Sequence, residues 1–176
     1  AAVTVLAAGA LWGWWLTNHP LREAPYLVQR GTPHQIALSN EQTGRFVLNT
    51  PSGKRLFVLD GELENRFTPD RRIRWIRIKG TAFADEEQKL SLAEVFAFAG
   101  NRLSDADLAS QPVETILARL GNTDGEDDAN FDIPSGAHIP YQLVFVELKQ
   151  PVLRGVAQVF SYQSNGQPIF VDAKSF

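Results

Sequence analysis

The sequence predicts a mainly β protein, an antiparallel β-sandwich with one helical insertion, preceded by a transmembrane helix. Three observations predict this architecture. The first 17 residues carry no charge. Apolar and polar residues alternate along several segments beyond residue 44, which is the period of a strand with one buried face. Between about residues 104 and 121 the apolar residues instead follow the spacing of an amphipathic helix.

Residues 1–17 are expected to form the transmembrane helix. Sixteen helical residues cover roughly 24 Å of a hydrocarbon core about 30 Å thick, and the sequence contains no methionine. We therefore expect the helix to begin upstream of Ala1. Tryptophan prefers the headgroup level of a bilayer. The downstream membrane interface is accordingly predicted at Trp12, Trp14 and Trp15.

Two other interpretations of residues 1–17 remain open, a signal peptide and a buried helix of a soluble core. A signal peptide has a basic start and small residues before its cleavage point, whereas this stretch ends in tryptophans. Gly9 and Gly13 stand four residues apart, a spacing of small residues that lets a second helix approach closely. This spacing predicts helix packing against a partner in the membrane.

The segment 18–43 is expected to be an extended tether, because it contains three prolines and no sustained apolar period. Two short apolar pieces, 26–28 and 36–38, interrupt it. Each is short enough to be a strand added to the edge of the domain, or simply part of the tether resting on it.

The first part of the domain 44–176, before the helical insertion, is expected to consist of strands. A short strand is predicted at 46–48, closed by a turn at 50–53. Alternating apolar residues then predict three further strands, at 55–66, 72–84 and 90–99. Three antiparallel neighbours in a row predict a meander with one covered face. Trp75, inside the second of these, is expected to pack in the core.

The helical insertion at about 104–121 has clear start and stop signals. Ser104 and Asp107 have the spacing of a capping box, which favours a short helix at 105–109. Pro112 suits the first position of a second helix, and Gly121 suits its end. An insertion of this size is expected to lie on the sheet or to cap one end of it.

The remaining strands close the domain. The segment 139–148 is apolar on both faces and is therefore expected to be a central strand. The strands 152–162 and 169–176 are joined by Ser164-Asn165-Gly166, a strong hairpin signal. The whole pattern favours a sandwich that is immunoglobulin-like or similar.

Composition excludes several classes of function. The chain has 17 Lys and Arg against 20 Asp and Glu, whereas a nucleic-acid-binding protein is usually basic. The absence of cysteine excludes disulfides, thiol catalysis and a cysteine-ligated zinc ion from this sequence. The three histidines are scattered, and no nucleophile-elbow motif occurs. We therefore expect no enzymatic activity, no cofactor, no metal site and no small-molecule ligand.

The acidic loop 122–131, with the aspartate that follows it, has oxygen-bearing side chains at alternate positions, which could converge on calcium. An EF-hand, however, needs a glycine at its sixth position and a glutamate at its twelfth, and Gly125 does not fit that pattern. A solvated acidic loop is the better interpretation.

A basic run marks the start of the second long strand. It is formed by Arg71, Arg72, Arg74, Arg77 and Lys79. These side chains are candidates for contact with a partner or with anionic lipid. The favoured alternative is protection of a sheet edge, where charges stop a strand from pairing with another chain.

Most of the domain resembles the proteobacterial domain-of-unknown-function family 3426. The resemblance is carried, in this order, by the segment 56–65, by 99–104 with the helices that follow, by 133–136 and by 141–145. The resemblance covers about residues 54–172. It implies a cytoplasmic zinc ribbon, a linker, one transmembrane helix and a β-sandwich-like domain outside the cytoplasm. The zinc-ribbon cysteines are absent from this sequence and are expected upstream of it. The resemblance implies no activity. Asn101 within it is either a partner contact or a residue that shapes the turn.

These observations predict a non-catalytic, single-pass protein of the bacterial inner membrane with its C-terminal domain in the periplasm. Its expected partners are the membrane and the subunits of an envelope membrane complex, for which it would be an accessory or stabilising subunit. No nucleic acid is expected. The alternative is a transmembrane signalling or regulatory protein, whose outer domain senses a ligand that the zinc ribbon reports. An envelope enzyme would require a pocket of convergent polar groups.

Overall fold

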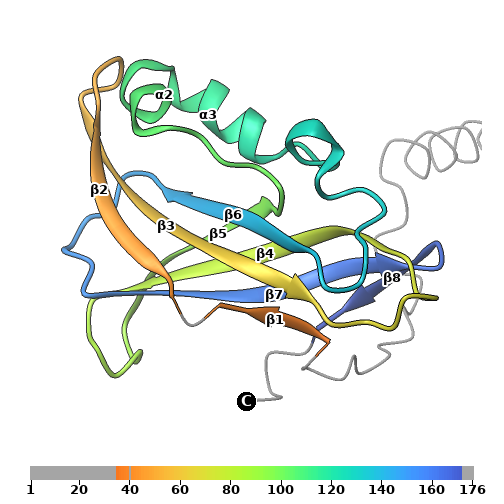
Figure 1. The fold of residues 1–176 in the computed structure, drawn as a ribbon. Helices are drawn as coiled ribbons and strands as arrows, with labels where there is room; N and C mark the ends of the chain where they lie inside the picture. Colours follow the sequence, from red (N-terminus) through yellow and green to blue (C-terminus); the bar gives the residue numbers. More distant parts are fainter. Residues whose placement is uncertain (1–34, 40, 172–176) are drawn as a thin grey trace, which may run out of the picture.

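A computed structural model of the chain describes residues 35–39 and 41–171. Within this part of the chain, eight strands form two antiparallel sheets, and the helices α2 (Asp105–Ser110) and α3 (Val113–Leu120) lie over one of them (Figure 1). The prediction of a mainly β fold with a helical insertion is confirmed. The expected transmembrane helix, with Gly9, Gly13 and the three tryptophans of its interface, lies outside the described residues. Among the described residues, no helix is long and apolar enough to cross a membrane.

The first sheet is organised around its longest strand, β3 (Lys54–Asn65). Along one edge of β3 runs β6 (His138–Phe145), and along the other run β2 (Thr43–Asn49) and β1 (Ile36–Leu38). The short apolar piece at 36–38 is therefore a strand, and the expected tether ends before it. β6 was expected to be central, but within the described residues it pairs with β3 alone.

The second sheet has the order β5 (Ser91–Phe98), β4 (Ile73–Phe83), β7 (Arg154–Ser164) and β8 (Gln167–Phe170). The predicted three-strand meander is therefore wrong, because β3 and β4 belong to different sheets. The loop between β3 and β4 carries the chain from the first sheet to the second. In this loop Phe67 is buried against the ring of Tyr162, a residue of β7. Edge protection is also wrong for the basic run, since β4 pairs along both of its edges.

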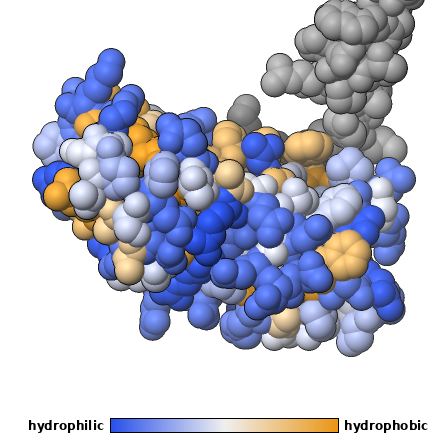
Figure 2. All heavy atoms as spheres, turned by 90° about the horizontal axis from the view of Figure 1, so that it is seen from above, coloured by the Kyte–Doolittle hydropathy of each residue, from blue (hydrophilic) through white to orange (hydrophobic). Residues whose placement is uncertain are grey.

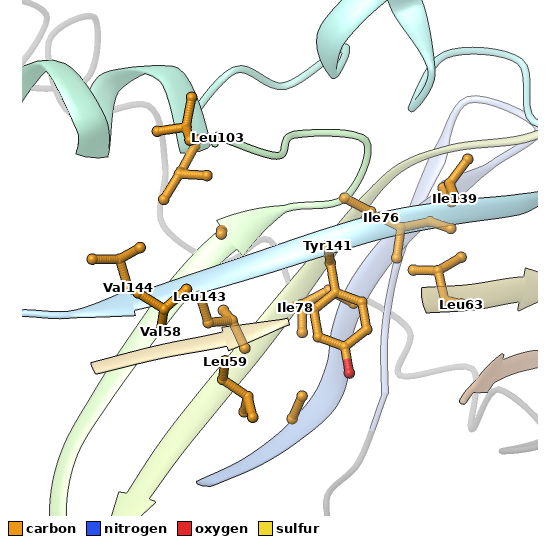
Figure 3. Close-up of a cluster of buried hydrophobic side chains, with 14 of the residues drawn as sticks. Val58, Leu59, Leu63, Ile76, Ile78, Leu103, Ile139, Tyr141, Leu143 and Val144 are labelled. Atoms are coloured by element: carbon orange, nitrogen blue, oxygen red, sulfur yellow. The ribbon is translucent and has the colours of Figure 1, made fainter. Parts of the chain in front are cut away.

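The core lies between the two sheets. Figure 3 shows Leu63 of β3, Ile76 and Ile78 of β4, and Tyr141 of β6 meeting there, and all four are buried. The sheets approach closely beside Gly80, where an added β-carbon would lie 2.8 Å from Cδ1 of Leu143. Alternation along β4 confirms the predicted pattern, with Ile76 and Ile78 inward.

A second apolar layer lies between the first sheet and the helices. Val58 and Val144 are cross-strand neighbours that turn away from the sandwich toward Leu103 (Figure 3). On the helices, Leu108 and Ile116 are fully buried. Both faces of β6 are thus covered although it pairs along one edge, which explains why its sequence resembled a central strand. Residues 56–60 of β3, a strand expected to be half-buried, are likewise buried on both faces.

Local signals for helix starts and turns are confirmed. The Ser104 hydroxyl accepts a hydrogen bond from the Asp107 amide at 3.1 Å and donates one to the Asp107 carboxylate at 2.8 Å. Pro112 precedes α3 rather than filling its first position. Asn165 and Gly166 form the β7–β8 turn with φ angles of 50° and 76°, the left-handed conformation that a two-residue hairpin requires.

Candidate protein interface

The outer face of the second sheet carries phenylalanine rings around one arginine. We call this set the aromatic face; it consists of Arg77, Phe96, Phe98, Phe160 and Phe170. Strand alternation places these side chains there. Because β4 buries Ile76 and Ile78, it turns Arg77 outward.

On β5, the buried residue of the same alternation is Ala97, so its two phenylalanine neighbours face outward. This arrangement was missed from the sequence. The alanines at 93 and 97 were the available signal, because they mark the inward positions of a strand whose large residues lie outside.

The rings of the aromatic face pack edge to face. The centroids of Phe96 and Phe160 are 4.9 Å apart, and those of Phe160 and Phe170 are 5.7 Å apart. The guanidinium carbon of Arg77 lies 4.6 Å from the Phe96 centroid, 5.6 Å from that of Phe160 and 5.8 Å from that of Phe98. These are cation–π distances.

Within residues 35–39 and 41–171, no carboxylate pairs with Arg77, although Lys79 beside it pairs with Glu94 at 2.5 Å. The rings therefore hold a guanidinium whose charge has no counterpart among the described residues. Phe96 is 42 % exposed, so the ring on which Arg77 stacks most closely is open to a partner. Arginine and aromatic residues dominate the energetics of many protein interfaces.

The opposite side of the domain differs in character. Viewed from the helix side, the surface is mostly hydrophilic, with apolar residues scattered across it (Figure 2). On α3, Leu117 is 46 % exposed. Scattered apolar residues are ordinary for a protein surface, whereas a contiguous aromatic group is not.

The structure does not bring the five basic residues together. Arg71 stacks on Phe67 and donates to the Ser164 hydroxyl at 2.9 Å. Arg72 pairs with Asp132 at 2.7 Å. A break in the β4–β7 register between Arg74 and Arg77 separates these residues from the aromatic face. Of these five residues, only Arg77 stacks on the rings of the aromatic face.

Trp75 was expected in the core, and this is wrong. It lies at the register break with a φ of 55° and is only half-buried. Its indole N–H donates to the Asp124 carboxylate at 2.7 Å, and the guanidinium of Arg74 lies 4.2 Å from its ring. The bulge turns the side chain out of the strand alternation, so that it anchors the acidic loop to β4.

Buried asparagines shape the corners around the helices. Asn101 is 4 % exposed and donates to the carbonyl of Asn122 at 2.7 Å, so it shapes the turn and is not a partner contact. Asn130 of the acidic loop is also buried and bonds to the backbone of Ile76. In the described part of the chain, no three histidine or acidic side chains lie close enough together to hold a metal ion.

No protein-family model, curated protein or solved structure matches this chain. The resemblance to family 3426 therefore stays a prediction, and the function is argued from the geometry of the domain.

Proposed function

We propose that this chain is a non-catalytic protein-binding module that is anchored to a membrane and serves as an accessory or stabilising subunit of an envelope complex. The observation that carries the proposal is the aromatic face. It combines a half-exposed ring, Phe96, with the guanidinium of Arg77, for which residues 35–39 and 41–171 supply no counter-charge. Such a surface contributes most to the free energy of binding when a partner covers the rings and places a carboxylate against the guanidinium.

We also infer that the sandwich is immunoglobulin-like. Taken in chain order from β2, the strands correspond to A, B, C, C′, E, F and G. The first sheet then reads A–B–E and the second C′–C–F–G. A strand C′ that joins the sheet of C, F and G occurs in variable-type immunoglobulin domains. Domains of this architecture commonly bind other proteins through the outer face of a sheet or through their loops.

The membrane location in this proposal rests on the sequence of residues 1–17. The helix would cross the bacterial inner membrane, with Trp12, Trp14 and Trp15 at its periplasmic interface and the domain in the periplasm. Gly9 and Gly13 would form a second contact with the complex inside the bilayer.

Site-specific cross-linking in the native cells tests the proposal. A benzoylphenylalanine placed at Phe96 is expected to yield an adduct with one defined partner chain. The matched control carries the same group at Leu117, which is equally exposed but lies on α3. Benzoylphenylalanine at Phe160 is expected to give an adduct with the same partner. Adding Arg77→Glu to that variant is expected to remove the adduct while the melting temperature stays within about 3 °C.

An equal yield of adduct at Phe96 and Leu117, or no adduct at Phe96, would contradict the proposed interface. So would an adduct that survives Arg77→Glu unchanged.

A further inference from the structure

A separate pocket lies between the start of β4 and the β7–β8 turn. Its volume is about 230 Å³, and its walls include Arg72, Arg74, Phe131, Asp132, Gln163 and Gly166. None of these residues belongs to the aromatic face. The pocket contains two of the basic residues that the sequence singled out and that the aromatic face does not use.

Arg74 is held in one orientation by three neighbours. Its guanidinium carbon lies 4.2 Å from the ring of Trp75 and 5.4 Å from that of Phe131, and its Nε donates a hydrogen bond to the side-chain oxygen of Gln163. Within the described residues, its two terminal nitrogens have no hydrogen-bond partner. A guanidinium held in this way loses little conformational entropy when it binds an oxyanion.

Arg72 supplies the second guanidinium of the pocket. Its Nη1 lies 2.7 Å from the Asp132 carboxylate, and both side chains are largely exposed. Exposed ion pairs of this kind contribute little free energy, so a ligand with greater negative charge can displace Asp132 from Arg72. Two guanidiniums against one carboxylate leave the pocket with a net positive charge.

We propose that this pocket binds a phosphate group, carried either by a lipid headgroup or by a soluble phosphate. A phosphate has enough oxygens to bind both guanidiniums at once. A carboxylate ligand would offer Arg72 no more than the carboxylate of Asp132 already does. Arginine binds phosphate through paired, charge-assisted hydrogen bonds.

The position of the pocket favours the headgroup as the source. The described chain begins at Gln35, whose carbonyl accepts a hydrogen bond from the Arg66 amide at the end of β3. The start of β4 and the β7–β8 turn lie at the same end of the domain as Gln35, and there Ile73 pairs with Ser164 and with Ile133. With the proposed anchor preceding Gln35, this end of the domain would face the membrane. The lipid source, but not phosphate binding itself, rests on the proposed membrane anchor.

The test uses the full chain in a neutral detergent and follows the amide resonances of Asn165 and Gly166 by NMR. Inorganic phosphate is titrated at constant ionic strength against chloride. Arg74→Gln and Arg72→Gln are each expected to weaken phosphate binding about tenfold, because each removes charge-assisted hydrogen bonds. Asp132→Asn is expected to strengthen it roughly threefold, because a competitor for Arg72 is lost.

Arg55→Gln is the matched control. Arg55 also stacks on an aromatic ring, that of Phe46 at 4.6 Å, but it lies at the opposite end of β3. Its substitution makes the same change in net charge and is expected to leave phosphate binding unchanged.

A second titration with dihexanoyl phosphatidylglycerol identifies the source. Binding about tenfold tighter than that of inorganic phosphate assigns the pocket to a headgroup, and equal or weaker binding assigns it to soluble phosphate. The proposal is overturned if neither ligand shifts the two resonances. It is also overturned if Arg55→Gln weakens binding as much as Arg74→Gln, because binding would then be diffuse attraction. Both results leave the test of the aromatic face unaffected.

Discussion

The phenol ring of Tyr141 lies across the α-carbon of Gly61, its direct neighbour on the adjacent strand. A β-carbon added to Gly61 would lie 2.5 Å from Cζ and 2.9 Å from Cε1 of the ring. The ring therefore occupies the space that any other residue at position 61 would need. Figure 3 shows the ring extending from β6 into the core between the sheets.

Gly61→Ala is expected to destabilise the domain by about 3 kcal/mol, because the buried ring has no free space into which it can move. Urea unfolding measures the change. The double variant with Tyr141→Leu should lose less than the sum of the two single variants, since the smaller side chain leaves space for the added methyl group. Additive effects would contradict the contact.

Tyr141→Phe is expected to leave the free energy of unfolding unchanged or to raise it by about 1 kcal/mol. The hydroxyl is buried, and within the described residues it has no hydrogen-bond partner, so its removal ends an uncompensated desolvation. Burial, with a smaller contribution from the charge of Asp60, also raises the pKa of Tyr141 above its ordinary value of 10.0. Thermal and urea unfolding measure the effect, and a loss above about 1 kcal/mol would show that the hydroxyl has a partner.

Asn130→Asp is expected to destabilise the domain by about 3 kcal/mol. The Asn130 amide nitrogen donates to the carbonyls of Thr123 and Ile76, at 2.9 and 3.2 Å, and a carboxylate would place an acceptor against these acceptors. The control is Asn165→Asp at the exposed β7–β8 turn, expected to change stability by less than about 0.5 kcal/mol. Equal effects of the two substitutions would contradict the role of Asn130.

The ion pair of Asp105 on α2 with Arg45 on β2 is expected to make a pH-dependent contribution to the free energy of unfolding, and Asp105→Asn removes it. Hydrogen bonds from the Arg45 guanidinium lower the pKa of Asp105 from its ordinary value of 3.8. A carboxyl whose pKa is lowered by folding stabilises the fold above its unfolded pKa, and this stabilisation is lost as the pH falls through the folded pKa.

Because Asp105 is largely exposed, wild type and Asp105→Asn should differ by only about 0.5 kcal/mol at pH 7. The difference should shrink and then vanish as the pH falls below 3.8 and through the lowered pKa of folded Asp105. Urea unfolding across this range checks it. In an Arg45→Gln background the same substitution should show a smaller difference at every pH, and an unchanged difference would rule out Arg45 as its source.

Cysteine labelling tests the proposed location. Residues 1–176 contain no cysteine, so Gln150→Cys at an exposed loop gives the domain one reactive thiol, and the unsubstituted protein is the control for any cysteine outside these residues. A membrane-impermeant maleimide is expected to label it once the outer membrane is permeabilised. Labelling only after the inner membrane is broken would place the domain in the cytoplasm and contradict the proposal.

Features that depend on neighbouring residues could be predicted from the sequence. The capping box of Ser104 and the turn at Asn165 each form within a few residues, and the alternation along β4 depends on that strand alone. Trp75 could not be placed in this way, because a bulge shifts the alternation by one residue, and the bulge is created by pairing with β7. The candidate interface was missed for a related reason, since its phenylalanines come from three different strands.

The sequence by itself determined the long strands, the helices and their order, because a period of two or of 3.6 residues is a property of consecutive side chains. The tertiary structure alone decided that β3 and β4 lie in different sheets and that β6, which among the described residues pairs with β3 alone, has both faces covered. It also decided that Arg72 and Arg74 line a pocket while Arg77 joins the aromatic face. Sheet pairing depends on which apolar surfaces are buried together, and those surfaces come from segments far apart in the chain.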